Sequence, residues 1–186
     1  MSTKPTALDI CSQIEDQAKQ LLKDMYAEYQ FSFSPCDSGE IPIYGYYLAL
    51  VLIHGTDLII TLRTYYDPGP IAALAANQIG IGIEDVTDHL IKDFVREFSN
   101  VLSARLKGNL NRAGIPTVAS IPVTGRGIDE LFFGPPKGNT KSDGSVGRFS
   151  WDKGSFVLSI HTELRTDDSE KVLRSLRYPH AEVKNV

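Results

Sequence analysis

Apolar side chains recur at helical spacing through residues 7–29, a segment whose other positions are mostly charged or polar. The recurring positions are Leu8, Ile10, Ile14, Ala18, Leu21, Leu22, Met25 and Tyr26. Steps of three and four residues place side chains on one face of a helix, so the pattern predicts an amphipathic helix with one buried stripe. Residues 31–35 then alternate apolar and polar side chains, which predicts a short strand.

The strongest strand pattern lies between residues 43 and 66. Residues 43–53 are apolar at odd and even positions alike, which is typical of a central strand covered on both faces. The sequence His54-Gly55-Thr56-Asp57 supplies turn-forming residues, and residues 58–65 return as a second strand. We therefore predict an antiparallel hairpin.

Two helices are predicted after this hairpin. The first is rich in alanine, begins near Pro70, where the first helical turn tolerates a missing amide hydrogen, and ends near Gly80. The second, residues 84–110, is the longest helical pattern in the chain. Its acidic residues come first and its basic residues come late, which is the order that the helix dipole favours.

The rest of the chain predicts a strand at 117–124 and a hairpin with arms 146–151 and 155–164. Residues 134–145 are polar and predict an inserted loop, and the charged residues 165–186 predict a peripheral tail. Antiparallel hairpins separated by helices indicate an α+β fold, a two-layer α/β sandwich with one long helix. No linker divides the chain, so we expect a single domain over residues 1–186, with its core at about 7–164.

Composition narrows the function classes. The formal net charge is −4, and no segment supplies the basic footprint of a nucleic-acid-binding protein. The longest apolar run, residues 46–53, is far shorter than the ~20 residues of a membrane-spanning helix. The first residues lack an apolar signal segment, and Cys11 and Cys36 lack the spacing of a metal or redox site. We expect a cytoplasmic protein with reduced thiols and no nucleic-acid or membrane partner.

Candidate chemistry lies on the long predicted helix. Glu97 and Asn100 are three residues apart, so they are surface neighbours just outside the apolar face. Asp93 precedes Glu97 by one turn, and the small Ala104 follows Asn100 by one turn. The helix is therefore expected to present a carboxylate and an amide side by side, next to a small residue that lets another surface approach closely.

The segment Asp93-Phe-Val-Arg-Glu97-Phe-Ser-Asn100 resembles the D/S-x-x-x-E-x-x-N signature of the CheC/CheX family of chemotaxis phosphatases. The surroundings are similar too, with an N-terminal helix, a hairpin with Gly55 in its turn, an alanine-rich helix before the motif and Ser120-Ile-Pro122 after it. The resemblance spans residues 7–164 and implies the pseudo-twofold fold of that family.

The resemblance also implies an activity. Such proteins hydrolyse the aspartyl phosphate of the phosphorylated receiver protein CheY, which supplies the phosphoryl group and the Mg²⁺, so no cofactor of the chain's own is expected. Asn100 would orient the attacking water, because an amide can donate and accept hydrogen bonds at once. Glu97 would pair with a receiver lysine, and Asp93 belongs to the motif without an assigned role.

Some relatives carry two motifs. We take the alanine-rich helix as the first-half equivalent of the motif helix. Its corresponding segment is Leu74-Ala-Ala-Asn77, which lacks the glutamate of the motif, so the chain resembles the single-motif CheX proteins. A homodimer joined through its sheets, with two separate sites, is implied. A further Glu-x-x-Asn, residues 182–185, lies in the tail and is assigned no function.

Two alternatives remain open. The chain could be a non-catalytic CheC-like dimeric adaptor that binds a receiver or another signalling partner. It could also be a structural or interaction domain in which the motif is coincidental.

Overall fold

The computed structural model describes residues 6–36, 47–127 and 141–177. In chain order the elements are α1 (Ala7–Met25), β1 (Ser32–Pro35), β2 (Tyr47–Gly55), β3 (Leu58–Tyr66), α2 (Pro68–Ile79), the short 3-10 helix η2 (Ile83–Asp85), α3 (Asp88–Arg112), β4 (Thr117–Ala119), β5 (Val123–Arg126), β6 (Lys141–Trp151), β7 (Gly154–Leu164) and α4 (Ser169–Arg177). The described strands form one antiparallel sheet in the order β1-β6-β7-β3-β2-β4, and β5 also pairs with β2. The predicted α+β class is confirmed.

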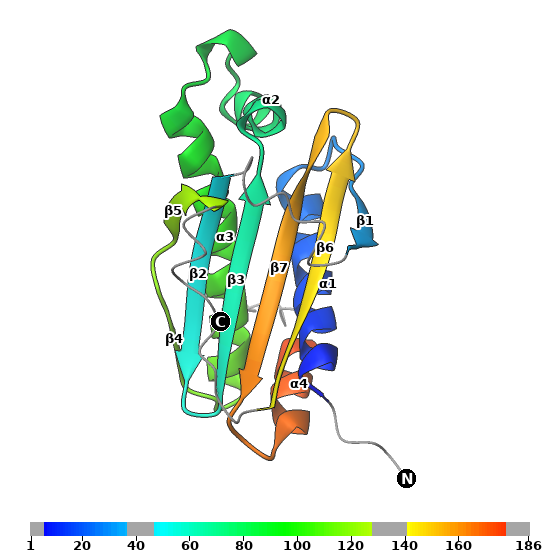
Figure 1. Ribbon diagram of the computed structural model, residues 1–186, viewed down its shortest axis with the longest axis vertical. Coiled ribbons are helices and arrows are strands. Elements are labelled where there is room, and N and C mark those ends of the chain that lie inside the picture. Colours follow the sequence, from blue (N-terminus) through cyan, green and yellow to red (C-terminus); the bar gives the residue numbers. More distant parts are fainter. Residues whose placement is uncertain (1–5, 37–46, 128–140, 178–186) are drawn as a thin grey trace, which may run out of the picture.

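The two long helices lie against the same face of the sheet (Figure 1). Helix α1 packs on β6 and β7, and α3 packs mainly on β2. Each long helix precedes one hairpin in the chain, α1 before β2–β3 and α3 before β6–β7, and packs on the other one. Because β3 and β7 are neighbours at the centre of the sheet, the halves are related by a pseudo-twofold axis between them.

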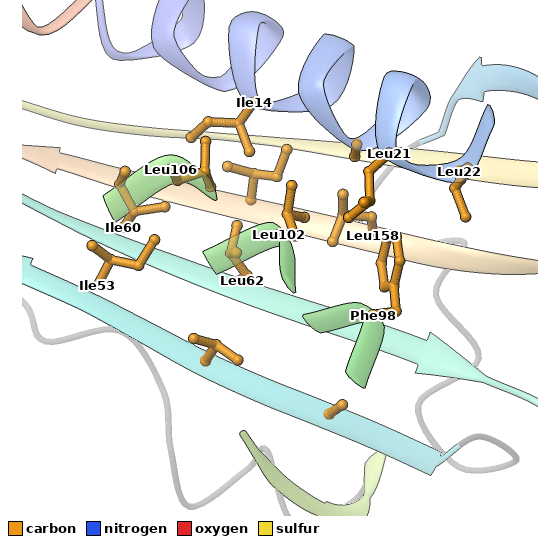
Figure 2. Packing of buried hydrophobic residues seen from close by; sticks show 14 of the residues in the cluster. Ile14, Leu21, Leu22, Ile53, Ile60, Leu62, Phe98, Leu102, Leu106 and Leu158 are labelled. Atoms are coloured by element: carbon orange, nitrogen blue, oxygen red, sulfur yellow. The ribbon is translucent and has the colours of Figure 1, made fainter. Parts of the chain in front are cut away.

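The core fills the space between these helices and the sheet (Figure 2). Ile14 on α1 and Leu102 and Leu106 on α3 meet side chains such as Ile60 and Leu158 from the strands. All five are at most 1% exposed. Full burial of an aliphatic side chain of this size is worth about 1.5–3 kcal/mol, so this layer fixes the position of α3 on the sheet.

Two predicted elements are each divided in the structure. The long helical pattern becomes η2 followed by α3, because Thr87 caps the longer helix by accepting a hydrogen bond from the Leu90 amide. The predicted strand 117–124 becomes β4 and β5, with Pro122, which has no amide hydrogen, between them. Ser120 still joins this break to β2, because its amide donates to the Leu52 carbonyl at 2.8 Å.

The predicted burial is wrong for some side chains in two segments. Strand β2 lies beside the edge strands β4 and β5, and its side chains Leu52 and His54 are exposed. Leu8 is 51% exposed, outside the buried stripe of α1. An apolar pattern reports which residues can be buried, but the neighbouring elements decide which of them are.

The predicted loop and tail also differ from the structure. Residues 141–145 of the predicted 134–145 loop form the first half of β6, since pairing with β7 needs backbone hydrogen bonds but no apolar side chains. Residues 134–140 lie outside the described part of the chain. In the tail, α4 packs on α1 and α3 and buries Val172, Leu173 and Leu176, so this part is not peripheral. None of the helices within the described ranges combines the length and apolarity that crossing a membrane requires.

Candidate functional site

The candidate motif lies on the outer face of α3. The inner face of that helix is apolar and packs on the core through Ile91, Phe94, Val95, Phe98, Leu102, Leu106 and Leu110. Asp88 in the first turn and Arg112 in the last turn complement the helix dipole. This long buried stripe sets the rotation of the helix, and that rotation turns Glu97 and Asn100 outward, where both are exposed.

Glu97 and Asn100 have no hydrogen-bond partner for their side chains within the described residues. At three residues apart on a helix, their Cβ atoms are separated by about 5–6 Å. The Asn100 main-chain carbonyl accepts a hydrogen bond from the Ser103 hydroxyl at 2.9 Å, but its side-chain amide remains open. The carboxylate and the amide are therefore both able to engage a molecule that approaches α3 from outside.

Asp93 and Ala104 flank this pair along the helix. The Asp93 carboxylate lies 2.8 Å from His89 Nδ1 and 3.4 Å from Arg96 Nη1, so it is engaged within its own helix. Ala104 is exposed and adds no bulk beyond its methyl group. Ala104 therefore adds little bulk to the outer surface of α3 one turn after Asn100.

Tyr26, which follows the end of α1, contacts both α2 and the part of α3 that carries the motif. Its buried ring lies 5.4 Å from the ring of Phe94, centroid to centroid, and its hydroxyl donates to Gln78 Oε1 on α2 at 3.4 Å. Burial raises the pKa of the Tyr26 hydroxyl far above its usual value, and the negative charges of Glu28 and Glu97 raise it further. The end of α1, the end of α2 and the motif turn of α3 therefore meet at one residue.

The structure changes the interpretation of the first-half helix. The topology makes α1 the counterpart of α3, whereas the sequence pattern suggested α2. Helix α1 contains no asparagine, so it carries no second motif. On α2, Asn77 already donates to Glu28 Oε1 at 2.8 Å and to the Tyr29 hydroxyl at 3.1 Å, which leaves its amide group without a free hydrogen.

Some supporting residues escaped the sequence analysis. Arg105 on α3 donates to the Asp24 carboxylate on α1 at 3.1 Å, and Glu28 holds the amide of Asn77. These residues are 81 and 49 positions apart along the chain, so no local pattern connects them. Among residues 6–36, 47–127 and 141–177, no group of three or more His, Cys, Asp or Glu side chains is arranged to hold a metal ion.

Comparison with known proteins gives structural matches without sequence matches. No protein-family model matches the chain, and no curated protein does. The crystal structure of CheX from Vibrio vulnificus is similar, with a TM-score of 0.62 and 18% identity, over 83% of this chain and 99% of that one. CheX from Desulfovibrio desulfuricans gives a TM-score of 0.58 and 20% identity, over 81% of this chain and 97% of the other.

A third similar structure is a complex of CheX with CheY, BeF₃ and Mg²⁺ from Borrelia burgdorferi. It gives a TM-score of 0.59 and 16% identity, over 83% of this chain and 97% of that chain. These matches cover 81–83% of this chain, and they agree in architecture at identities too low to carry residue roles across. The chain therefore has the fold of the CheC and CheX chemotaxis proteins.

Proposed function

We propose that this protein hydrolyses the aspartyl phosphate of a CheY-like receiver in chemotaxis or a related two-component pathway. Asn100 holds the attacking water through its amide, as an amide side chain does in GTPases. Glu97 pairs with a receiver lysine and fixes the register in which α3 docks. The register matters because a displacement of ~1 Å can cost ~10²-fold in rate.

The reaction is a transfer of the phosphoryl group to water. The water oxygen forms a bond to phosphorus while the bond between phosphorus and the aspartate oxygen breaks. The electron pair of that bond stays with the aspartate carboxylate, and both hydrogens of the water leave with inorganic phosphate. The Mg²⁺ of the receiver would offset negative charge on the phosphoryl oxygens, so this chain needs no metal of its own for the step.

One observation carries the proposal: Glu97 and Asn100 are exposed side by side on the outer face of α3, whose inner face packs in the core, and neither side chain is engaged within the described residues. Asn77 provides the contrast, because its amide hydrogens are already donated to Glu28 and Tyr29. A water-holding amide must keep at least one hydrogen and its oxygen free, and Asn100 meets that requirement.

The test is release of inorganic phosphate from CheY of the same organism, charged with acetyl phosphate, with and without this protein. We expect wild type to accelerate release and Asn100→Ala to lose ~10²-fold or more of that acceleration. Asn77→Ala serves as the matched control, since it removes an exposed asparagine amide elsewhere, and should leave the rate unchanged. Binding without acceleration would instead favour the adaptor function. If the protein shows no binding and no acceleration, both functions are rejected and only the fold assignment stands.

We further propose a homodimer that leaves α3 uncovered. Apolar side chains are exposed on and between the edge strands β4 and β5, with Val118 67%, Ile121 82% and Val123 56% exposed. Light scattering after size-exclusion chromatography should give twice the mass of one chain, and Ile121→Asp should shift the protein toward the monomer. A wild-type mass of one chain at micromolar concentration would reject the dimer.

A further inference from the structure

Helix α3 carries three arginines in different surroundings. The Arg105 side chain is only 18% exposed and donates to Asp24 on α1 at 3.1 Å. Arg112 donates to the Asn109 side chain at 2.6 Å at the end of the helix. Arg96 lies within the motif, its side chain is 46% exposed, and its ion pair is a 3.4 Å contact with Asp93 on the same helix. Arg105 holds two helices together, whereas Arg112 and Arg96 are both exposed, and of these two it is Arg96 that lies beside Asn100.

Arg96 lies one helical turn before Asn100, so the two side chains reach the same outer surface. Glu97 lies on the side that faces α1, where its charge acts on the Tyr26 hydroxyl. Arg96 lies on the opposite side, where its positive charge acts on the Tyr66 hydroxyl of β3. Asn100 therefore has a carboxylate on one flank and a guanidinium on the other.

A second cation extends the flank of Arg96. The Lys92 ammonium lies 5.8 Å from the centre of the Tyr47 ring, one turn before Arg96. The Asp93 contact does little to neutralise Arg96, because exposed ion pairs are weak and because His89 lies closer to the same carboxylate, at 2.8 Å.

The acidic Asp88 lies one turn beyond Lys92 and also acts on Tyr66. The positive charge of this flank is therefore concentrated at Arg96 and Lys92, next to Asn100. That end of the flank suits an anion.

We propose that Arg96 contacts the phosphoryl oxygens of the aspartyl phosphate when α3 docks on the receiver. The inference rests on the proposed function and adds a catalytic residue to it. Negative charge is spread over three phosphoryl oxygens in the transition state, and a planar guanidinium can donate to two of them at once. On docking, Arg96 exchanges its weak contact with Asp93 for the contact with the phosphoryl oxygens. Asn100 holds the water that attacks the phosphorus atom of the same phosphoryl group.

The experiment compares full-length Arg96→Gln and Arg96→Lys with wild type in the phosphate-release assay. Arg174→Gln is the matched control, because it removes one positive charge from the exposed face of another helix, α4, where the side chain is 69% exposed. We expect Arg96→Gln to lower kcat by ~10-fold or more, which is less than the ~10³-fold of an arginine finger, because the receiver supplies other positive charge. Arg96→Lys should recover part of the loss, and Arg174→Gln should behave as wild type.

A second readout separates contact with the phosphoryl group from general attraction. Affinity is measured for CheY loaded with BeF₃ and Mg²⁺ and for unloaded CheY, with circular dichroism to verify that each variant is folded. Arg96→Gln should lose most of the preference for the loaded form. An equal loss of affinity for both forms would overturn the inference, since Arg96 would then contact a permanent acidic group of the receiver.

The two proposals fail separately. If wild type accelerates release and Asn100→Ala does not, but Arg96→Gln matches wild type, only the role of Arg96 is overturned. If wild type neither accelerates release nor prefers the loaded receiver, the proposed function is overturned and the role of Arg96 with it. If wild type binds without turnover, the preference for the loaded form still decides whether Arg96 recognises the phosphoryl group.

Discussion

The Arg105 guanidinium reaches from α3 to the Asp24 carboxylate on α1, with 3.1 Å between Nη2 and Oδ2. Gln20 holds the other oxygen of the same carboxylate at 2.7 Å, so Asp24 is fixed from two sides. This ion pair joins the two long helices two turns after Glu97. The contact lies on the side of α3 that faces α1, as Glu97 does.

Breaking this ion pair should lower stability by a small amount. We expect a double-mutant cycle of Asp24→Ala and Arg105→Ala to give a coupling energy of ~0.5–1 kcal/mol, because Asp24 is partly exposed and water screens the pair. Urea denaturation of the four proteins measures it. Additive effects of the two substitutions would mean that the contact contributes nothing to the joining of the helices.

Stability should depend on pH through His161 on β7. Burial lowers the pKa of this imidazole and the positive charge of Arg63 lowers it further, while Glu163 and Asp143 act in the opposite direction. The unfolded chain takes up a proton near pH 6.5 that the folded protein resists, so stability falls as the pH drops through 6.5 toward the lowered folded pKa.

The measurement is the free energy of unfolding of wild type and His161→Gln between about pH 7.5 and 5.5. The wild type should lose more stability than the variant over this range, because glutamine takes up no proton in either state. Parallel curves would show that another group controls the pH dependence.

Two glycine substitutions should have opposite effects. A Cβ atom at Gly55 would lie 2.6 Å from the Pro116 carbonyl oxygen and 2.8 Å from Thr117 Cγ2, within the pairing of β2 with β4. We expect Gly55→Ala to destabilise the protein by about 1–3 kcal/mol, as overpacking does. Gly108 in α3 has no atom within 4 Å of such a Cβ, so Gly108→Ala should stabilise by up to ~1 kcal/mol. Thermal unfolding of both variants tests the pair, and a loss of stability in Gly108→Ala would contradict it.

The sequence was sufficient to predict the elements that depend on local pattern. The stripe of α3, the turn at Gly55 and the helix end at Gly80 all rest on residues within a few positions of each other, and the structure has each of them. The exposure of Glu97 and Asn100 follows from the same stripe, because the apolar face of α3 determines which side chains face outward.

Features that depend on distant neighbours were beyond the sequence pattern. β2 lies next to the edge of the sheet because the short strands β4 and β5 pair with it, and the sequence of β2 does not indicate which strands are its neighbours. Helix α4 lies in a charged segment, where three apolar residues at helical spacing are too few to stand out until α1 and α3 offer a surface. The contacts of Arg105 with Asp24 and of Asn77 with Glu28 are long-range for the same reason.

Removing one apolar contact of α4 should therefore be costly. Leu176 is 2% exposed and lies in the hydrophobic core, and its carbonyl accepts a hydrogen bond from Gln17 on α1 at 2.7 Å. We expect Leu176→Ala to destabilise the protein by about 2–5 kcal/mol, the usual range for truncating a buried leucine. The exposed neighbour Arg177 provides the control, since Arg177→Ala should change stability by less than ~0.5 kcal/mol. Equal effects of the two substitutions in urea denaturation would mean that α4 adds little to the core.

With the proposed roles, Glu97→Gln and Asn100→Ala should affect different kinetic constants, because docking and water positioning contribute to different steps. Glu97→Gln keeps the shape of the side chain and removes its charge, and a hydrogen bond to a charged group is worth about 1.5–3 kcal/mol. We expect the variant to raise KM for the phosphorylated receiver by about tenfold or more, to lower kcat less, and to weaken the dependence of binding on salt. Asn100→Ala should lower kcat with little change in KM, since the water is held only during the reaction. The same loss of kcat in both variants would contradict this division of roles. It would place the Glu97 carboxylate in the chemical step, close to the phosphorus, and not in a pair with a receiver lysine.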